Sequence, residues 1–331
     1  MNVWRPMLKP YLKIYKDGND DKLIVYGHAE QIWEIEGASV VDLVDLLPHI
    51  NGINTMEQAA EAAGKAPELV EEIIYYLKDQ GMLWNQEADC AFEDLEMSLN
   101  GHEIFLSRYL DLRQVKSLQE VKIAIVEKCP QWKYDLIEGL KKIGVKNIQE
   151  FDDITSITGT YHLAVIMDSG LNGQLFIEAE ERFKESGTPW MKISVFNEEI
   201  GVGPIFIPDA TACYKCYKQR FLSNRKNPEY AVRLFNDSVK SRVDPIANSY
   251  GGAGQLIGGY GSLEILKFFT GLPCQIVGAE YSLNVMSLEC TLSPVWKVPY
   301  CTSCVSSTDK EPKYIMENSF DLAMKGDFLV D

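Results

Sequence analysis

VKIAIVEKCPQWKYDLIEGLKKIG, at residues 121–144, is the most informative stretch of this sequence. It opens with a short apolar run typical of a buried strand, and apolar residues then recur at helical spacing. Nucleotide-binding α/β domains begin with such a strand and helix, but they carry a glycine-rich turn between the two. Here the turn is EKCPQ, residues 127–131, which has no glycine and places a carboxylate where a phosphate would bind. The stretch predicts an α/β domain without the usual phosphate loop.

Residues 118–331 continue this alternation of strands and helices. Strands are predicted at 145–151, 161–168, 189–196 and 201–208, and later at 274–283, 285–292 and 295–300. Helices are predicted at 175–187, 214–225, 230–243 and 252–270. The alternation is typical of an α/β domain.

Residues 1–90 are predicted to form a smaller unit, joined to the first by a connector at 91–117. Three strands, at 11–18, 22–29 and 31–37, precede helices at Ser39–Leu47, Thr55–Ala63 and Pro67–Gln80. Thr55 is a suitable N-cap, with Gln58 in the capping-box position and Gly64 as the stop. Three strands followed by three helices indicate a winged-helix module.

The third predicted helix carries two neighbouring apolar rows: Val70, Ile74 and Leu77 in one, and Leu69, Ile73 and Tyr76 in the other. A helix packed on one side needs a single broad stripe, so the second row either widens the core face or lines a groove. The third strand, QIWEIEG at residues 31–37, raises a related question. If it lies at a sheet edge, its backbone groups can pair with an incoming peptide.

Charge and composition exclude several classes of protein. The formal net charge is −16, and residues 1–90 contain seven Lys/Arg against sixteen Asp/Glu, which disfavours nucleic acid as a partner and a DNA-binding regulator as the function. No apolar run has the length of a membrane span, and MNVWRPMLKP does not resemble a secretory signal. A cytoplasmic protein is expected.

Four of the eight cysteines form two C-x-x-C pairs, Cys213/Cys216 and Cys301/Cys304. In a reducing compartment such pairs supply the four thiolates of a tetrahedral zinc site, which leaves no position for water or substrate. The sequence therefore predicts a structural Zn²⁺. A redox-active dithiol is the alternative, and disulfides are the third. The scattered Cys90, Cys129, Cys274 and Cys290 are interpreted as packing or incidental residues.

The glycine-rich stretch SYGGAGQLIGGYGSLEILKFF, residues 249–269, has no Lys-Ser/Thr ending of a P-loop. Leu256, Gly259, Leu263 and Leu266 recur at helical spacing. The stretch is interpreted as a helix packed closely against a neighbour, with phosphate binding as the alternative.

With these motifs in order, residues 118–305 resemble the ThiF-like, ubiquitin-activating-type fold. The resemblance rests on IMDSGLN (166–172), GVGPIFIPDATACYKC (201–216), GSLEILKFFTG (261–271) and PYCTSC (299–304). The second motif is especially similar to the version found in biosynthetic clusters for azole- and azoline-containing peptides. There the domain follows a winged-helix module that binds the leader of a precursor peptide, which is also the order of units here.

Active members of that fold adenylate a carboxylate, using phosphate-binding glycines, a D-x-x-D-N metal motif and Arg/Lys around the triphosphate. In this sequence the metal motif aligns with Asp168, but Leu171 replaces the second acid before Asn172 and cannot hold Mg²⁺. The stretch QEFDDITSITGTYH, residues 149–162, has no Arg or Lys. With the turn at 127–131, three parts of the nucleotide site are missing. We expect a homologue that binds no ATP and is not an enzyme.

The resemblance implies a scaffold that binds a precursor leader peptide and presents the core to a YcaO-type ATP-dependent cyclodehydratase, with a homodimer as the expected assembly. The peptide would add as a strand beside residues 31–37. The expected peptide-binding residues are Gln31, Ile32, Trp33, Glu34, Ile35, Leu69, Glu72, Ile73 and Tyr76. The alternative is a ThiF-like enzyme that adenylates a peptide carboxylate.

Overall fold

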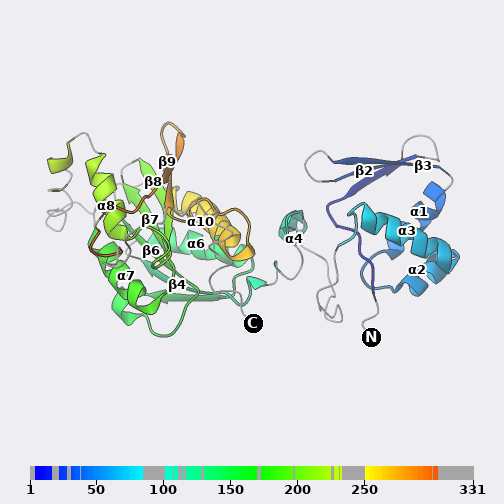
Figure 1. Cartoon of the computed structure of the whole chain (residues 1–331), viewed down its shortest axis with the longest axis horizontal. Helices are drawn as coiled ribbons and strands as arrows, with labels where there is room; N and C mark the ends of the chain where they lie inside the picture. Colours follow the sequence, from blue (N-terminus) through cyan, green and yellow to red (C-terminus); the bar gives the residue numbers. More distant parts are fainter. Residues whose placement is uncertain are drawn as a thin grey trace. The chain divides into compact units, whose positions relative to one another are not determined.

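The computed structural model of the chain describes residues 4–16, 22–27, 31–37, 39–84, 101–106, 108–110, 114, 117–127, 130–169, 173–196, 198–224, 227–230, 232, 250–299 and 301–304. The chain divides into two compact units, Met1–Lys116 and Ser117–Asp331. Each unit has its own sheet and its own hydrophobic core (Figure 1). A short helix, α4 (Gly101–Leu106), belongs to the first unit.

The first unit contains a three-stranded antiparallel sheet. Its strands are β1 (Lys13–Lys16), β2 (Lys22–Tyr26) and β3 (Ile32–Glu36), with β2 in the centre. Its helices are α1 (Ser39–Leu46), the 3₁₀ helix η1 (Leu47–His49), α2 (Met56–Ala63) and α3 (Pro67–Asp79). The core is built from alternate residues of the strands and the apolar faces of the helices: Leu23, Val25, Val40, Leu43, Leu46, Val70, Ile74 and Leu77 are all buried in it.

Local signals fix the ends of α2 as the sequence predicts. The Thr55 hydroxyl accepts a hydrogen bond from the Gln58 backbone N–H at 3.2 Å, and the Gln58 side chain accepts from the Thr55 N–H at 2.9 Å. Gly64 ends the helix with a φ of 64°, a conformation that glycine adopts without steric cost. The capping box is therefore confirmed.

The second unit is built on a seven-stranded mixed sheet in the order β10-β9-β8-β7-β6-β4-β5. The strands are β4 (Lys122–Glu127), β5 (Asn147–Phe151), β6 (Leu163–Ser169), β7 (Trp190–Phe196), β8 (Glu199–Phe206), β9 (Ala279–Asn284) and β10 (Cys290–Pro294). The first four pair in parallel and the last three join antiparallel. The fold class is thus α/β with a mixed sheet.

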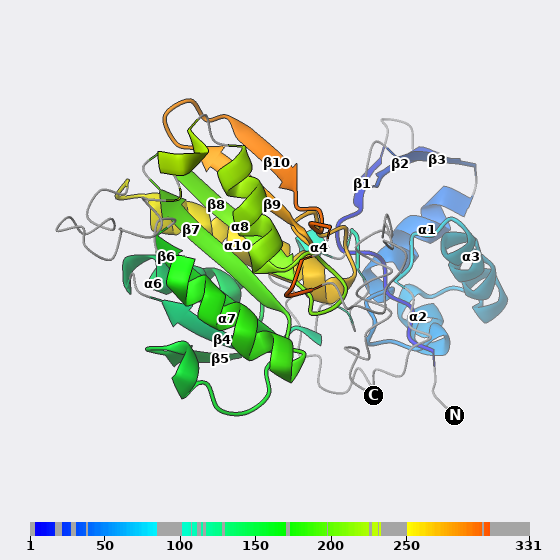
Figure 2. The same ribbon diagram turned by 60° about the vertical axis from the view of Figure 1, so that its left-hand side comes forward.

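Helices cover both faces of this sheet (Figure 2). One face carries α6 (Pro130–Lys142) and α10 (Ala253–Thr270); the other carries α7 (Gly173–Ser186) and α8 (Tyr214–Ser223). A 3₁₀ turn, η3 (Ile154–Ser156), follows β5 and packs near α7. Among the helices that the structure describes, none is both long and apolar enough to cross a membrane.

Close packing of α10 against α6 is present, and Leu266 of the expected set is buried, but the closest approach between the helices is made by other residues. A Cβ on Gly258 would lie 2.5 Å from the Asp135 carbonyl oxygen, and one on Gly139 would lie 2.6 Å from the Gly258 carbonyl oxygen. Gly259 instead faces open space and Leu263 is 42% exposed. The expected face is rotated from the observed one because nearly every position of this helix is apolar or small, so periodicity does not single out a side.

The C-terminal strands also differ from expectation. Residues 285–287 form the turn of a hairpin, where Asn284 Oδ1 accepts from the Met286 and Ser287 N–H groups, and β10 starts only at Cys290. Residues 295–299, predicted as part of a strand at 295–300, are irregular, and the carbonyls of Trp296 and Lys297 accept side-chain hydrogen bonds from Arg220. Most of the predicted helix at 230–243 lies outside the described residues.

Candidate functional site

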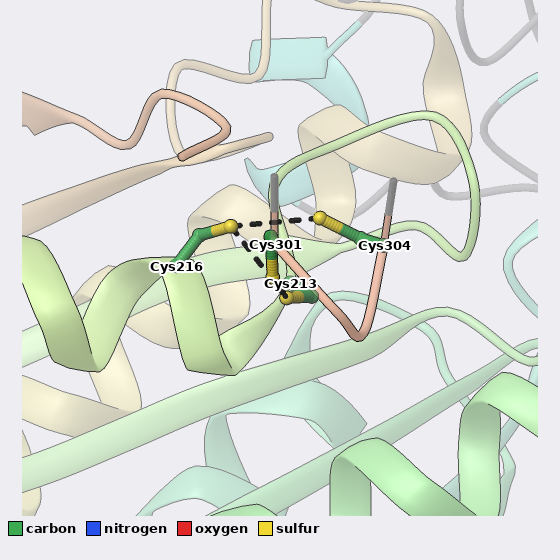
Figure 3. Close-up of side chains that lie close together, drawn as sticks. All are labelled: Cys213, Cys216, Cys301 and Cys304. Carbon is green, nitrogen blue, oxygen red and sulfur yellow. Dashed lines mark hydrogen bonds between the residues drawn. The ribbon is translucent and has the colours of Figure 1, made fainter. Parts of the chain in front are cut away.

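The structure brings the four paired cysteines together (Figure 3). All four Sγ atoms lie within 4.8 Å of one another, at 3.7 Å for Cys213–Cys216, 3.6 Å for Cys213–Cys301 and 3.5 Å for Cys216–Cys304. A tetrahedral ion with Zn–S bonds of about 2.3 Å separates its sulfurs by about 3.8 Å. The four residues therefore fit a metal ion such as Zn²⁺, which would have four protein ligands and no open position.

Two separate segments supply these sulfurs. Cys213 is the N-cap of α8 and Cys216 lies one turn into the helix, so both sulfurs fall on the same side of its first turn. Cys301 and Cys304 come from a turn in which the Cys301 N–H donates to the Val298 carbonyl at 3.1 Å.

The surroundings of the cluster are those of a closed site. Cys216 is fully buried, Cys213 and Cys301 are buried, and only Cys304 is partly exposed. The Val298 N–H donates to Cys216 Sγ at 3.2 Å, a contact of the kind that orients a metal ligand. Hydrogen bonds from Cys213 and Cys216 lower the pKa of Cys304 well below its usual value.

The segment that carries the second cysteine pair is also tied to α8 by polar contacts. Arg220 donates from Nε to the Trp296 carbonyl at 2.6 Å and from Nη2 to the Lys297 carbonyl at 3.2 Å. Lys215 Nζ donates to Thr302 Oγ1 at 2.6 Å, and Lys184 of α7 donates to the Ser303 carbonyl. These bonds join the segment that carries the second pair to α7 and α8.

The other cysteines that the structure describes lie apart from this cluster. Cys274 is buried, which raises its thiol pKa, and its Sγ lies 3.5 Å from the Glu264 carbonyl oxygen. Cys290 is exposed on β10. Cys90 and Cys129 lie outside the described residues.

The strand expected to pair with a peptide lies at an edge. Among the described strands, β3 pairs with β2 alone. Its side chains alternate: Ile32 and Glu34 are exposed, whereas Trp33 and Ile35 are half-buried and pack against the core. Gln31, just before the strand, is also exposed. One face of β3 is thus exposed, with Ile32 followed by Glu34, and the other packs Trp33 and Ile35 against the core.

On α3 the second apolar row divides between core and surface. Ile73 is only 7% exposed and belongs to the core with its neighbour Ile74, so the wider core face is the correct interpretation at this position. Leu69 is half-buried against the core, while Glu72 is exposed and Tyr76 is 42% exposed. Ile73 therefore packs in the core, Leu69 lies at the border of the core, and Tyr76 is at the surface.

Two neighbouring parallel strands of the second unit carry buried carboxylates at or near their carboxyl ends. Glu127 ends β4 and Asp168 lies near the end of the neighbouring β6, and both carboxylates are buried. Lys128, Leu171 and Asn172 lie outside the described residues.

The structure also contains a buried ion pair, Lys192–Glu280, that was not predicted from the sequence. Lys192 of β7 donates from Nζ to Glu280 Oε1 of β9 and to Ser194 Oγ, each at 2.7 Å. The Tyr217 hydroxyl of α8 donates to the Glu280 carboxylate at 2.9 and 3.0 Å. A Cβ on Gly201 would lie 2.6 Å from Glu280 Oε1, so a glycine is needed beside the pair.

A sequence signal for this pair existed. WMKISVF, residues 190–196, is otherwise apolar, and a lysine in the middle of a buried strand must find a partner. Glu280 in the apolar stretch VGAEYSL is the matching signal, although only the sheet order shows that the two residues meet.

No protein-family model matches the sequence, and no curated protein matches it. Solved structures do resemble this one. The heterocyclase TruD gives a TM-score of 0.68 at 18% identity, over 91% of this chain and 42% of that one. A heterocyclase in complex with substrate and cofactor gives 0.68 at 16% identity, over 90% and 39% of the two chains. MccB of E. coli, solved with AMPCPP and MccA, gives 0.57 at 13% identity, over 90% and 99%.

The chain thus spans about two fifths of the heterocyclase chains and nearly the full length of MccB. At such low identities the likeness concerns the fold. The described residues share the fold of these heterocyclases and of MccB.

Proposed function

We propose that the protein is a non-catalytic scaffold in the maturation of ribosomally made, azole- or azoline-modified peptides. It binds the leader of a precursor peptide and presents the core to a YcaO-type ATP-dependent cyclodehydratase. The open edge of β3 carries this proposal, because it offers backbone groups to an incoming strand beside the apolar Trp33 and Ile35. The shared fold with structures described as heterocyclases supports it.

In this proposal the first unit is a winged-helix recognition element. The leader adds to β3 as a fourth strand and reaches toward Leu69, Glu72 and Tyr76 on α3. Binding the leader keeps the modifiable residues at high local concentration near the enzyme, so each of them need not be recognised separately.

The second unit is, in this proposal, a ThiF-like domain that has kept its fold and lost adenylation. The buried Glu127 at the end of β4 supports the loss, because a carboxylate there opposes an incoming phosphate. A Zn²⁺ held by the four cysteines would stabilise the domain without taking part in chemistry. The expected assembly is a cytoplasmic homodimer that docks the cyclodehydratase.

The alternative is an enzyme that adenylates a peptide carboxylate. The buried Asp168 near the end of β6 favours it, as does a fold shared with MccB, which has been solved with AMPCPP. ATP–pyrophosphate exchange separates the two functions. The scaffold gives no exchange above background with the precursor peptide present, whereas clear exchange establishes the enzyme.

Peptide binding is tested by titrating the full chain with a fluorescently labelled precursor peptide encoded beside its gene. Glu34→Pro should abolish binding, since proline removes an N–H directed at the open edge while leaving the pairing with β2 intact. Lys16→Pro makes the same change at the opposite edge of the sheet, on β1, and should leave binding unchanged. Equal affinity of the wild-type protein and the Glu34→Pro variant would refute peptide capture at β3.

A further inference from the structure

The hydrogen-bond pattern of β3 determines which groups meet an added strand. The Gly27 N–H donates to the Gln31 carbonyl at 2.8 Å, so the pair Gly27–Gln31 is a hydrogen-bonded one. In an antiparallel ladder such pairs alternate, which directs the N–H and C=O groups of Ile32, Glu34 and Glu36 toward the open edge. A peptide residue bonded to one of these three places its side chain on the same face of the sheet as theirs.

That face is acidic at its edge. Lys22 of β2 lies between the two glutamates of β3, with Nζ 2.8 Å from Glu34 Oε2 and 3.0 Å from Glu36 Oε1. Both carboxylates raise the pKa of Lys22, so it stays protonated. Lys22 pairs with both carboxylates, so the trio of Lys22, Glu34 and Glu36 has a net charge of −1. The side chains of Glu34 and Glu36 are 58% and 65% exposed.

On this face, the first residues of β3 form an apolar surface. Ile32 is 53% exposed and pairs with Tyr26, which is 42% exposed and packs edge-on against Tyr15 at 5.6 Å. On the opposite face, Trp33 and Ile35 present half-buried apolar surface beside the core. An added strand therefore meets apolar surface on one face, and on the other an apolar end followed by an acidic one.

We propose that the peptide captured by β3 alternates apolar residues with basic ones, and that its Lys or Arg side chains lie opposite Glu34 and Glu36. This inference rests on the proposed function and names the chemistry of its ligand. Opposite charges on directly paired residues of neighbouring strands attract and like charges repel, so a basic residue gains affinity where an acidic one loses it. The gain is about two- to fivefold per position and declines with added salt.

The test is selection of a random nine-residue peptide library, displayed on mRNA, against the immobilised full chain. Wild-type protein should enrich Lys or Arg at two positions separated by one residue, with apolar residues between and beside them. The triple variant K22E/E34K/E36K keeps both ion pairs and reverses the net charge of the trio, so it should enrich Asp or Glu at those positions. Glu61→Lys, on an exposed side of α2, makes a charge reversal away from the edge and should select as the wild type does.

A milder variant guards against misfolding. E34Q/E36Q should weaken a selected basic peptide about two- to fivefold per position, with an unchanged circular dichroism spectrum. Selected peptides that lose binding with Glu34→Pro but show neutral or acidic residues at the two positions would overturn this inference and leave peptide capture standing. Peptides whose binding Glu34→Pro leaves intact would overturn both.

Discussion

Lys192 and Glu280 are charged residues held inside the second unit, and each depends on the other. Loss of one partner leaves a buried charge, which costs about 3–5 kcal/mol of unfolding free energy. We expect Lys192→Met and Glu280→Gln each to destabilise the protein by about this amount, and the double variant by less than the sum. Urea denaturation followed by tryptophan fluorescence measures the unfolding free energy of each variant.

The exposed pair Lys141–Glu138 on α6 is the control for that experiment, because ion pairs in solvent contribute little. Removing either member should shift the midpoint only slightly. Additive effects of Lys192→Met and Glu280→Gln would show that the two charges act independently.

His162 should make stability depend on pH. Its Nδ1 accepts from the Lys122 N–H at 2.9 Å, and burial and then the charge of Lys122 lower its pKa below the ordinary 6.5. Below about pH 6.5 the unfolded chain gains a proton that the folded one resists, so the unfolding free energy falls as the pH decreases toward the folded pKa.

His162→Gln should flatten this dependence between about pH 7.5 and 5, measured by urea unfolding at each pH. An NMR titration that gives His162 a pKa at or above 6.5 would contradict the assignment.

At the scale of elements, the contact between α6 and α10 predicts opposite effects for neighbouring glycines. Gly258→Ala places a methyl group against the Asp135 backbone and should destabilise by about 1–3 kcal/mol. Gly259→Ala meets open space and should stabilise by about 0.5–1 kcal/mol through helix propensity. Thermal melts of the two variants should move in opposite directions, and a shift of the same sign in both would refute the packing.

Elements bounded by local chemistry were predictable from the sequence. The Thr55–Gln58 capping box and Gly64 fix α2 because every interaction involved lies within a few residues. The face of α10 was not predictable, since only the position of α6 makes Gly258 the residue in contact. The edge position of β3 likewise depends on sheet order, which alternation of apolar residues does not specify.

The cysteine cluster lies between these cases. Each C-x-x-C pair is a local motif, and two pairs in one chain suggest a shared ion. Cys213 and Cys301 are nevertheless 88 residues apart, so only the fold brings their sulfurs together. Lys192 and Glu280 are separated by the same number of residues, but no local sequence motif predicts their contact.

For the molecule as a whole, we expect about one zinc per chain by mass-spectrometric metal analysis of the purified protein. Cys213→Ser and Cys304→Ser should each remove most of it, and acidification should release it because protons compete for the thiolates. Cys290→Ser, at an exposed cysteine on β10, should retain the full amount. Unchanged zinc in the first two variants would refute the site.

The separation of the two cysteine pairs also sets an order of events while the chain is being made. Cys213 and Cys216 leave the ribosome 88 residues ahead of Cys301 and Cys304. At about 5–20 residues per second, the leading pair waits about 4–18 s for its counterpart. During this interval α10 and β9 are synthesised between the two halves of the site, and a metal ion that arrives early finds only two sulfurs. If the cluster holds Zn²⁺ as proposed, newly made protein should be lost on zinc depletion before protein that is already folded.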